Sequence, residues 1–284
     1  MSLRKLPEIK AFHAPPKARW DIPSSALDKW SPSSKVEDAP GTISIFEGIG
    51  EQWDGSGVTT KRMAGILRSL GERDVIVSIN SPGGDFFEGV SIYNLLRMHP
   101  AKVTVQVTGL AASAASIIAM AGDDIQIAES GFLMIHNSWS VVMGNRHDLR
   151  AAIDILEPFD EAMVGVYVAR SGMDAAKVAA MMDKDTWIGG KEAIILGLAD
   201  SLLAEGEART QTDTKAMYAR RQIESALAKQ GVPRDTRTAM LSELLGARDA
   251  AGGDGPSGTR DAAGEHMIEA LQGLHKLFSH KEIT

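Results

Sequence analysis

Two serines, Ser113 and Ser116, lie within the stretch VTVQVTGLAASAASIIAMAG, residues 103–122, among residues that are almost all small. The stretch is typical of a β-strand that turns tightly and continues as a helix, and both serines fall where that helix begins. A serine at such a turn can act as a nucleophile, because the turn lifts its hydroxyl out of the sheet edge and free N–H groups at the helix start can stabilise an oxyanion. Small residues at a helix start also permit close packing, so this stretch alone leaves both interpretations open.

A pair of glycines follows the predicted strand in SINSPGGDFFEG, residues 78–89. The strand ends at Asn80, and Gly83 and Gly84 permit positive φ angles and the close approach of another backbone. A turn without any function explains these glycines equally well.

A histidine and two aspartates complete the candidate chemistry. His136 follows four apolar residues in FLMIHNS, residues 132–138, at the end of a predicted buried strand. Histidine titrates near neutral pH and can serve as the general base for a serine, although a single histidine in a buried strand is more often a hydrogen-bonded core residue. Asp183 and Asp185 precede an aromatic residue in MMDKDTWIGG, residues 181–190, and taken alone they are explained as hydrated surface carboxylates.

Taken together and in this order, INSPGG, GLAASAA, MIH and DKDTWIGGKEA…GLADS resemble the proteolytic subunit of the Clp protease. The segments FEGIGE, SIYNLLRMHP and AASIIAMAGD are most similar to the Clp-type head maturation proteases of tailed bacteriophages and prophages. The resemblance covers residues 42–203 and, weakly, the N-terminal LPEI. It implies an α/β protein with the Clp/crotonase-like fold, in which stacked β-α-β units form a mostly parallel sheet with an inserted strand-helix handle.

The resemblance also implies a role for each residue of the motifs. Ser113, rather than Ser116, matches the nucleophile, His136 the general base, and Asp185 a buried carboxylate that orients the histidine. The backbone N–H groups of Gly84 and Ala114 match the oxyanion hole. Many cellular Clp subunits have methionine where this chain has Ala114, a change that a backbone donor tolerates. These roles agree with the chemistry, because a serine hydroxyl is inert without a hydrogen-bonded base.

We expect the substrate to bind as an added β-strand between two segments of the chain, Gly84–Phe86 and Asn137–Trp139. Both segments should end in exposed edges beside the candidate triad, and a protease must hold its scissile peptide extended. The predicted substrate-binding residues are Gly83, Asp85, Phe86, Asn137, Ser138 and Trp139. The motifs predict a site that uses no cofactor and no metal ion.

The elements around these motifs alternate between strands and helices, which is typical of a parallel sheet covered by helices. The predicted strands are 42–46, 74–80, 102–107, 124–128 and 132–136, and the predicted helices are 58–73, 89–99, 145–170 and 174–183, followed by a turn, a helix and a closing strand within 186–203. Thr59 or Thr60 is the expected N-cap of the first helix and Gly71 its end. The long helix 145–170 contains Pro158, where we expect a kink or a break.

Three parts follow from this organisation. Residues 1–40 are an N-terminal arm that we expect to be extended and anchored by Trp20 and Trp30, residues 41–204 are the Clp-like domain, and residues 205–284 are a linker with a helical extension. For the extension, a dispensable tail and a DNA-binding helical pair are alternatives to the docking module that we favour, which would bring the domain to an assembling capsid through the amphipathic helix 267–278.

Composition limits the protein class. The 284 residues are 44% hydrophobic and 24% charged, with a net charge of −7 and no cysteine. The acidic balance argues against nucleic-acid or membrane-surface binding, and the absence of cysteine excludes disulfides and a thiol nucleophile. No signal-peptide or membrane-spanning pattern is present. We therefore expect a cytoplasmic protein of a bacterium or infected host, which could also act inside the prohead.

The predicted function is an ATP-independent serine endopeptidase that works through an acyl-enzyme, forms a ring-shaped homo-oligomer and cleaves a protein substrate, the capsid or scaffold precursor of a phage prohead. A non-catalytic scaffold on the same fold is the main alternative. A crotonase-type acyl-CoA enzyme would leave the Ser113–His136–Asp185 set unexplained. A peptidase with Lys184 or Lys191 as its base would leave the histidine unexplained.

Overall fold

The computed structural model describes residues 19–20, 22–30, 41–52, 56–204, 223–232, 236–237 and 239–240. The chain divides into two compact units, Met1–Thr238 and Ala239–Thr284. All but the last two described residues belong to the first unit. The predicted helix 267–278, the linker that follows residue 204 and the N-terminal LPEI lie outside the described residues.

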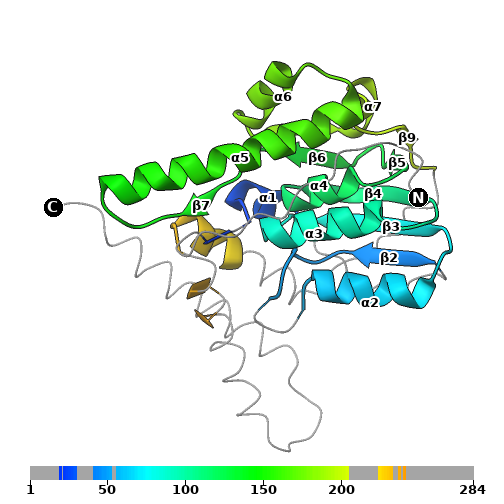
Figure 1. Ribbon diagram of the computed structural model, residues 1–284, viewed down its shortest axis with the longest axis horizontal. Helices are drawn as coiled ribbons and strands as arrows, with labels where there is room; N and C mark the ends of the chain where they lie inside the picture. Colours follow the sequence, from blue (N-terminus) through cyan, green and yellow to red (C-terminus); the bar gives the residue numbers. More distant parts are fainter. Residues whose placement is uncertain are drawn as a thin grey trace, which may run out of the picture. The chain divides into compact units, whose positions relative to one another are not determined.

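A seven-stranded sheet forms the centre of the first unit (Figure 1). Its strands are β2 (Thr42–Ile45), β3 (Val75–Ser81), β4 (Val103–Ala112), β5 (Asp124–Ile127), β6 (Phe132–Ile135), β8 (Thr186–Gly189) and β9 (Ser201–Leu202). Every pair of neighbouring strands in this sheet is parallel except β6 and β8, which are antiparallel. The α/β fold with a mostly parallel sheet is therefore confirmed.

Strand β4 is longer than the sequence pattern predicted, and it pairs with two different strands along one side. Its first half pairs with β5, from Thr104 opposite Asp124 to Val107 opposite Ile127. Its second half pairs with β6, ending at Ala112 opposite Met134. As a result, β6 continues the sheet beyond the end of β5 and brings its own carboxyl end beside that of β4.

Between β2 and residue 204, the described part of the chain forms six helices that accompany the sheet. They are α2 (Thr60–Leu70), α3 (Phe86–Arg97), α4 (Ala114–Ala119), α5 (Arg146–Ser171), α6 (Ala175–Met182) and α7 (Gly190–Ile195). Thr59 caps α2 by accepting a hydrogen bond from Arg62 N–H, and Gly71 ends the helix with a φ of 68°, as predicted. No helix in the described part of the chain is long and apolar enough to cross a membrane.

The main hydrophobic core lies between the sheet and these helices. Its fully buried side chains come from β3 and β4, from α3 and from α5, including Val77, Val105, Ile92 and Val166. Burial of each such side chain contributes about 1.5–3 kcal/mol to folding. Within the core, α4 follows β4 directly and packs against both α3 and α5.

Helix α5 runs for 26 residues through Pro158, so a break at this proline, one of the two predicted outcomes, is wrong. Pro158 and Asp154 are both exposed, and the Asp154 carbonyl that loses its helical partner therefore faces water. A capping box joins Asn145 and Asp148 at the start of the helix. The short strand β7 (Ser140–Val141) precedes it, and the first half of α5 extends away from the sheet (Figure 1).

The N-terminal segment contains a helix, α1 (Ser24–Lys29), so the expectation of a fully extended arm is wrong. This helix packs against the sheet face opposite the main core. Alternate residues of β4 point to opposite faces, so Ala111 belongs to the main core while Leu110 and Ala112 belong to a second buried cluster that includes Leu27. Trp30 anchors the segment as predicted, because its indole N–H donates a 2.9 Å hydrogen bond to the carbonyl of Asn80.

A helical segment of the C-terminal extension, residues 223–229, contacts α1. Ser225 donates a hydrogen bond to the Asp28 carboxylate, and Lys229 Nζ lies 2.6 Å from the same carboxylate. Ala228 packs beside the cluster around Leu27. This part of the extension therefore belongs to the first unit.

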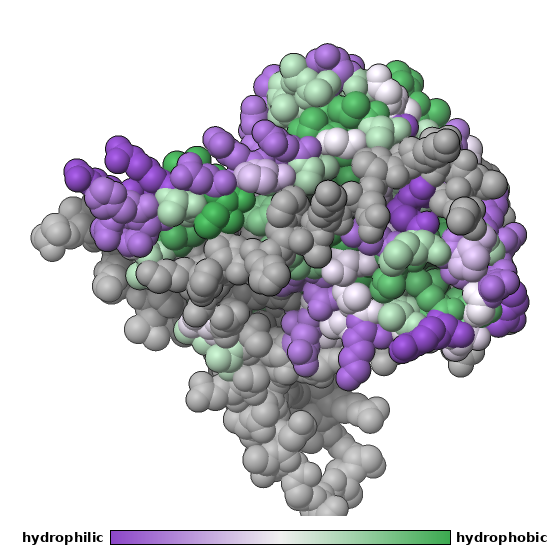
Figure 2. Space-filling view, viewed as in Figure 1, coloured by the Kyte–Doolittle hydropathy of each residue, from purple (hydrophilic) through white to green (hydrophobic). Residues whose placement is uncertain are grey.

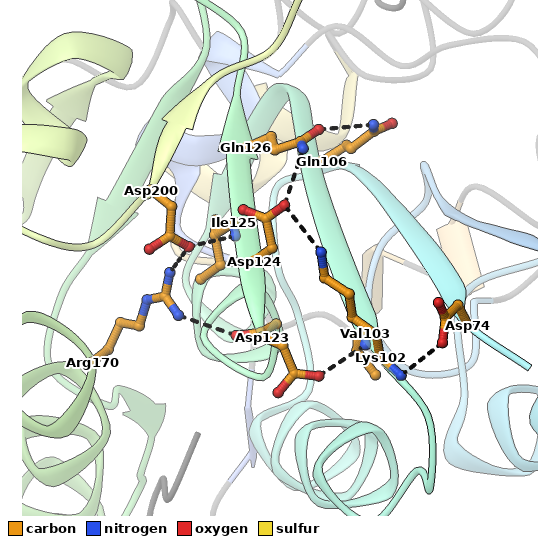
Figure 3. A network of polar contacts seen from close by, with 11 residues as sticks. Asp74, Lys102, Val103, Gln106, Asp123, Asp124, Ile125, Gln126, Arg170 and Asp200 are labelled. Carbon is orange, nitrogen blue, oxygen red and sulfur yellow. Dashed lines mark hydrogen bonds and ion pairs between the residues drawn. The ribbon is translucent and has the colours of Figure 1, made fainter. Parts of the chain in front are cut away.

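Aspartates hold the amino ends of the parallel strands (Figure 3). Each accepts a hydrogen bond from a backbone N–H at the start of a neighbouring strand: Asp74 from Lys102 at 3.1 Å, Asp123 from Val103 at 2.9 Å, and Asp200 from Ile125 at 2.8 Å. Arg170 of α5 joins this network, because its guanidinium donates to the Asp200 carboxylate and to the carbonyl of Gly122. The network fixes the end of the sheet that lies opposite the carboxyl ends of β4 and β6.

The first prediction compares two adjacent aspartates of this network. The Asp123 side chain is 0% exposed and also pairs with Arg97, whereas the Asp124 side chain is 28% exposed and pairs with Lys102. Replacing Asp123 by alanine leaves the buried N–H of Val103 without an acceptor and removes the carboxylate beside Arg97, and it should lower the free energy of unfolding by about 3 kcal/mol. Asp124→Ala, the matched control, should cost less than about 1 kcal/mol. Urea denaturation measures both, and equal losses would contradict this account.

Candidate active site

Strand register brings Ser113 and His136 together. Ser113 follows the last residue of β4, and its N–H donates a 3.0 Å hydrogen bond to the carbonyl of Met134 in β6. His136 follows the last residue of β6. Because the two strands are parallel neighbours, both side chains lie at the same edge of the sheet, and His136 Nε2 is 2.7 Å from Ser113 Oγ. This distance is that of a hydrogen bond between a nucleophile and its base.

The antiparallel partner of β6 brings Asp185 to the same edge. Ile135 pairs with Thr186, so the same register continued by one residue puts His136 opposite Asp185. The negative charge of Asp185 raises the pKa of His136. However, no hydrogen bond joins these two side chains in the described structure, and Asp185 is exposed. The prediction of a buried carboxylate is therefore wrong for the isolated chain.

Two members of this group have strained backbones. Among the described non-glycine residues, only Ser113 and Asp185 have a positive φ, at 53° and 49°. Such conformations cost about 1–3 kcal/mol each and persist where surrounding contacts enforce them, which is common at functional sites. At Ser113 the unusual conformation forms the sharp turn from β4 into α4 that the sequence predicted.

The two glycines before α3 must be glycine for steric reasons. Gly83 has a φ of 90°, and a Cβ added there would lie 2.6 Å from the Cβ of Ser113. Gly84 has a φ of 148°, and a Cβ added there would lie 2.2 Å from the carbonyl oxygen of Ile49. The SPGG turn therefore lies in direct contact with the turn at Ser113. A turn without any function would not need this contact.

The backbone N–H groups of Gly84 and Ala114, which lie beside Ser113, have no acceptor within the described part of the chain. Ile49 N–H donates to the Gly83 carbonyl at 2.8 Å, and Asp85 N–H donates to the Ile49 carbonyl at 3.0 Å. This parallel bridge turns the Gly84 N–H away from Ile49. Ala114 is the first residue of α4, so its N–H has no intrahelical acceptor. Both groups are available to stabilise negative charge.

Burial keeps His136 neutral. Its side chain is 8% exposed, and desolvation lowers the pKa of His136 to about 4. The charge of Asp185 and a backbone hydrogen bond with Asn137 oppose this shift but do not overcome it. At neutral pH the imidazole is therefore uncharged, and in the tautomer with its proton on Nδ1 it has a free lone pair on Nε2 that can accept the hydroxyl proton of Ser113.

The other serine of the turn does not contact the histidine. Ser116 is fully buried, and its hydroxyl lies 2.6 Å from the carbonyl of Ser113 and 2.7 Å from the hydroxyl of Tyr167 in α5. The structure thus places Ser113, and not Ser116, in contact with His136.

Acidic side chains hold the segment Asn137–Trp139, one of the two segments predicted to bind the substrate strand. Asn137 donates a 2.8 Å hydrogen bond to Asp183, and the N–H and the hydroxyl of Ser138 both donate to Asp160 at 2.6 Å. The sequence did not reveal Asp160, because its position in a long amphipathic helix gives no local signal. The indole N–H of Trp139 is buried and has no acceptor in the described part of the chain.

The other predicted substrate segment is shorter than expected. Asp85 caps α3 by accepting a hydrogen bond from the N–H of Glu88, so the helix begins at Phe86. Phe86 is buried against Phe87 and Phe159. The prediction that Phe86 belongs to an extended edge is wrong, because Phe86 is the first residue of α3 and its ring packs in the core.

These observations define a class, an α/β protein that presents a serine–histidine pair at a strained strand-to-helix turn. A family model described as Clp protease matches residues 57–206, so the chain belongs to the Clp protease family. Curated relatives include ATP-dependent Clp protease proteolytic subunit 1 of Protochlamydia amoebophila, 30% identical over 135 residues that cover 46% of this chain and 66% of the relative. Proteolytic subunit 3 of Rhodococcus jostii is 28% identical over 136 residues that cover 47% of this chain and 67% of the relative. The matches thus span about two thirds of these relatives' length.

The second prediction concerns the protonation of His136. In a titration followed by the NMR signals of the histidine rings, His136 should titrate near pH 4, well below its ordinary value of 6.5. Asp185→Asn removes a charge that favours the protonated form, so the pKa of His136 should fall further. Asp183→Asn is the matched control and should leave it unchanged. A pKa near 6.5 in the folded protein would contradict the structure.

Stability should follow the same shift. The unfolded chain takes up a proton on this histidine near pH 6.5, while the folded chain does so only near pH 4. The free energy of unfolding should therefore fall as the pH decreases through this window.

Proposed function

We propose that this chain is a Clp-type serine endopeptidase that cleaves peptide bonds through an acyl-enzyme, with Ser113 as nucleophile, His136 as base and Asp185 as its electrostatic partner. The observation that carries the proposal is the 2.7 Å contact between His136 Nε2 and Ser113 Oγ at a strained turn, in a chain of the Clp protease family. A non-catalytic scaffold has no need for a buried neutral histidine at hydrogen-bond distance from a serine.

The chemical steps follow from these positions. His136 accepts the proton of Ser113 as Oγ attacks the scissile carbonyl, and the N–H groups of Gly84 and Ala114 stabilise the oxyanion. The imidazolium then donates its proton to the leaving amine, and the acyl-enzyme forms. Water, deprotonated by the same histidine, attacks the ester and releases Ser113. No step consumes a nucleotide, so hydrolysis at this site is ATP-independent.

The low pKa of His136 in the free enzyme has a consequence for these steps. A histidine with a pKa of about 4 is a weak base, so its protonation must become easier as the reaction proceeds. The developing negative charge of the oxyanion and the charge of Asp185 both favour the imidazolium. Asp185 therefore acts mainly in the transition state.

The substrate strand is proposed to lie between Gly83–Asp85 and Asn137–Trp139. Both segments border Ser113, and an extended peptide laid along them would gain backbone hydrogen bonds in the manner of an added β-strand. Asp160 and Asp183 fix the second segment through Ser138 and Asn137, so that edge is held in place before a substrate binds.

The third prediction tests the nucleophile. Ser113→Ala should reduce hydrolysis of an unfolded protein such as casein by a factor on the order of 10⁴ or more. It should also abolish covalent labelling by a fluorophosphonate probe, while circular dichroism shows an unchanged fold. Ser69→Ala, an exposed serine on α2, is the control and should retain full activity. Activity that survives in Ser113→Ala would refute the proposed function.

We also propose that the protein works as a ring-forming homo-oligomer joined through the strand-helix handle formed by β7 and α5. The outer part of this handle exposes apolar side chains, with Met143 83%, Leu149 47% and Ile153 56% exposed. Figure 2 shows hydrophobic residues between the hydrophilic side chains along α5. An apolar stripe of this kind is suited to a partner surface.

The fourth prediction tests this assembly by light scattering. The double variant Leu149→Asp with Ile153→Asp should reduce the mass in solution relative to the unchanged protein, because charge replaces apolar contact area. Met98→Asp is the matched control, since Met98 is 63% exposed but lies at the end of α3, and it should leave the mass unchanged. An unchanged protein that is monomeric and fully active would refute the ring.

The proposed physiological substrate is the capsid or scaffold precursor of a phage prohead, and the extension of residues 205–284 is proposed to dock the enzyme to it through the predicted amphipathic helix 267–278. The support is the similarity of FEGIGE, SIYNLLRMHP and AASIIAMAGD to phage head maturation proteases. Incubation of a capsid precursor with the unchanged protein and with Ser113→Ala tests the substrate. Casein cleavage without precursor cleavage would retain the protease and exclude this substrate.

A further inference from the structure

A buried chain of hydrogen bonds connects α5 to the backbone of Ser113. The hydroxyl of Ser116 lies 2.6 Å from the Ser113 carbonyl oxygen, which can only accept. Ser116 therefore donates its single proton there. The hydroxyl of Tyr167, 2.7 Å away, must then donate to Ser116 Oγ. Ser116 is 0% and Tyr167 1% exposed, so water does not compete for these bonds.

The carbonyl at the end of this chain belongs to the same peptide unit as the N–H of Ala114. In a trans peptide the C=O and the N–H point in opposite directions within one plane. Fixing the carbonyl of Ser113 therefore fixes the direction of the Ala114 N–H. That N–H has no acceptor in the described part of the chain and is the group proposed to stabilise the oxyanion.

We propose that Ser116 and Tyr167 are positioning residues that hold the Ser113–Ala114 peptide so that its N–H points at the developing oxyanion. The inference rests on the proposed function and adds to it two residues that touch neither the substrate nor the reacting atoms.

The Ser113 carbonyl receives more hydrogen bonds than the helix alone supplies. The N–H groups of Ser116 and Ile117 donate to it at 2.9 Å and 3.4 Å, and the Ser116 hydroxyl adds a third bond that is shorter than either. The third bond adds support to a peptide that follows a strained residue, since Ser113 has a φ of 53°.

The chain of hydrogen bonds also makes the N–H of Ala114 a stronger donor. Hydrogen bonds that end on a carbonyl polarise the peptide unit and make its N–H a better donor, and this effect is larger away from water. Burial raises the pKa of Tyr167, so its hydroxyl keeps its proton and remains a donor throughout the working pH range.

The test uses four variants: Ser116→Ala, Tyr167→Phe, the double variant that combines them, and Tyr93→Phe as the matched control. Tyr93 is also a fully buried tyrosine, and its hydroxyl bonds Arg97 on α3, away from Ser113. Each variant is measured for kcat and KM on a peptide, for the rate of fluorophosphonate labelling of Ser113, and for its urea midpoint.

A positioning role gives a specific pattern of rates. Losing one oxyanion donor outright costs about 10²–10³ in kcat, so misdirecting it in Ser116→Ala should lower kcat and the labelling rate about ten-fold, with KM unchanged. Tyr167→Phe leaves the Ser116 bond in place and should cost about three-fold by loss of polarisation. Tyr93→Phe should lower the urea midpoint without changing kcat.

The double variant separates positioning from packing. In Ser116→Ala the hydroxyl of Tyr167 is buried without a partner, so adding Tyr167→Phe should raise the urea midpoint again. The labelling rate should nevertheless stay at the level of Ser116→Ala. Recovery of the rate together with stability, or full kcat in Ser116→Ala, would overturn the positioning role. An unchanged protein that neither cleaves peptide nor is labelled at Ser113 would instead overturn the proposed function.

Discussion

The parallel pairing of β4 with β6 is the interaction on which the site depends. Because β4 continues past the end of β5, its last residues pair with β6, and the two strands finish side by side at Ala112 and Met134. The residue after β4 is Ser113 and the residue after β6 is His136. The antiparallel partner β8 then brings Asp185 opposite His136. Three residues far apart in the chain meet because three strand ends meet.

Contacts on both faces of the sheet keep these strand ends in place. The main core covers one face, and α1 covers the other directly behind the site, with Leu27 against Leu110 and Met134. Lys29 of α1 also lies 3.8 Å from the ring centre of Trp187 in β8. Aspartates hold the opposite, amino-terminal ends of the strands. The carboxyl ends are thus free to carry strained and unpaired groups, because stabilising contacts are concentrated elsewhere.

The electrostatics of the site follow from where each side chain lies relative to water. His136 is buried and is neutral at rest, whereas Asp185 is exposed and acts on His136 through its charge. Water around an exposed carboxylate weakens its effect on a neighbour. A second copy or a substrate that covers Asp185 would exclude this water. The Asp185 charge would then favour the protonated form of His136 more strongly than it does in the isolated chain.

Local patterns determined much of this protein without its structure. Alternating apolar residues gave the strands, Thr59 and Gly71 bounded a helix, and the motifs around Ser113, His136 and Asp185 gave the Clp family and the candidate site. The start of α3 was predicted three residues too late, at residue 89, although Asp85 and Glu88 form a capping pattern there. These features depend on neighbouring residues, whose preferences are written in short segments.

Only the tertiary structure decided the features that join distant segments. The division of β4 between two partners, the exposure of Asp185, the contact of Asp160 with Ser138 and the bond between Ser116 and Tyr167 each depend on how separate elements pack. Pro158 shows the same limit, because whether a proline breaks a helix depends on whether the carbonyl it frees can reach water. Such outcomes are set by how whole elements pack, and no short segment contains the information that determines this packing.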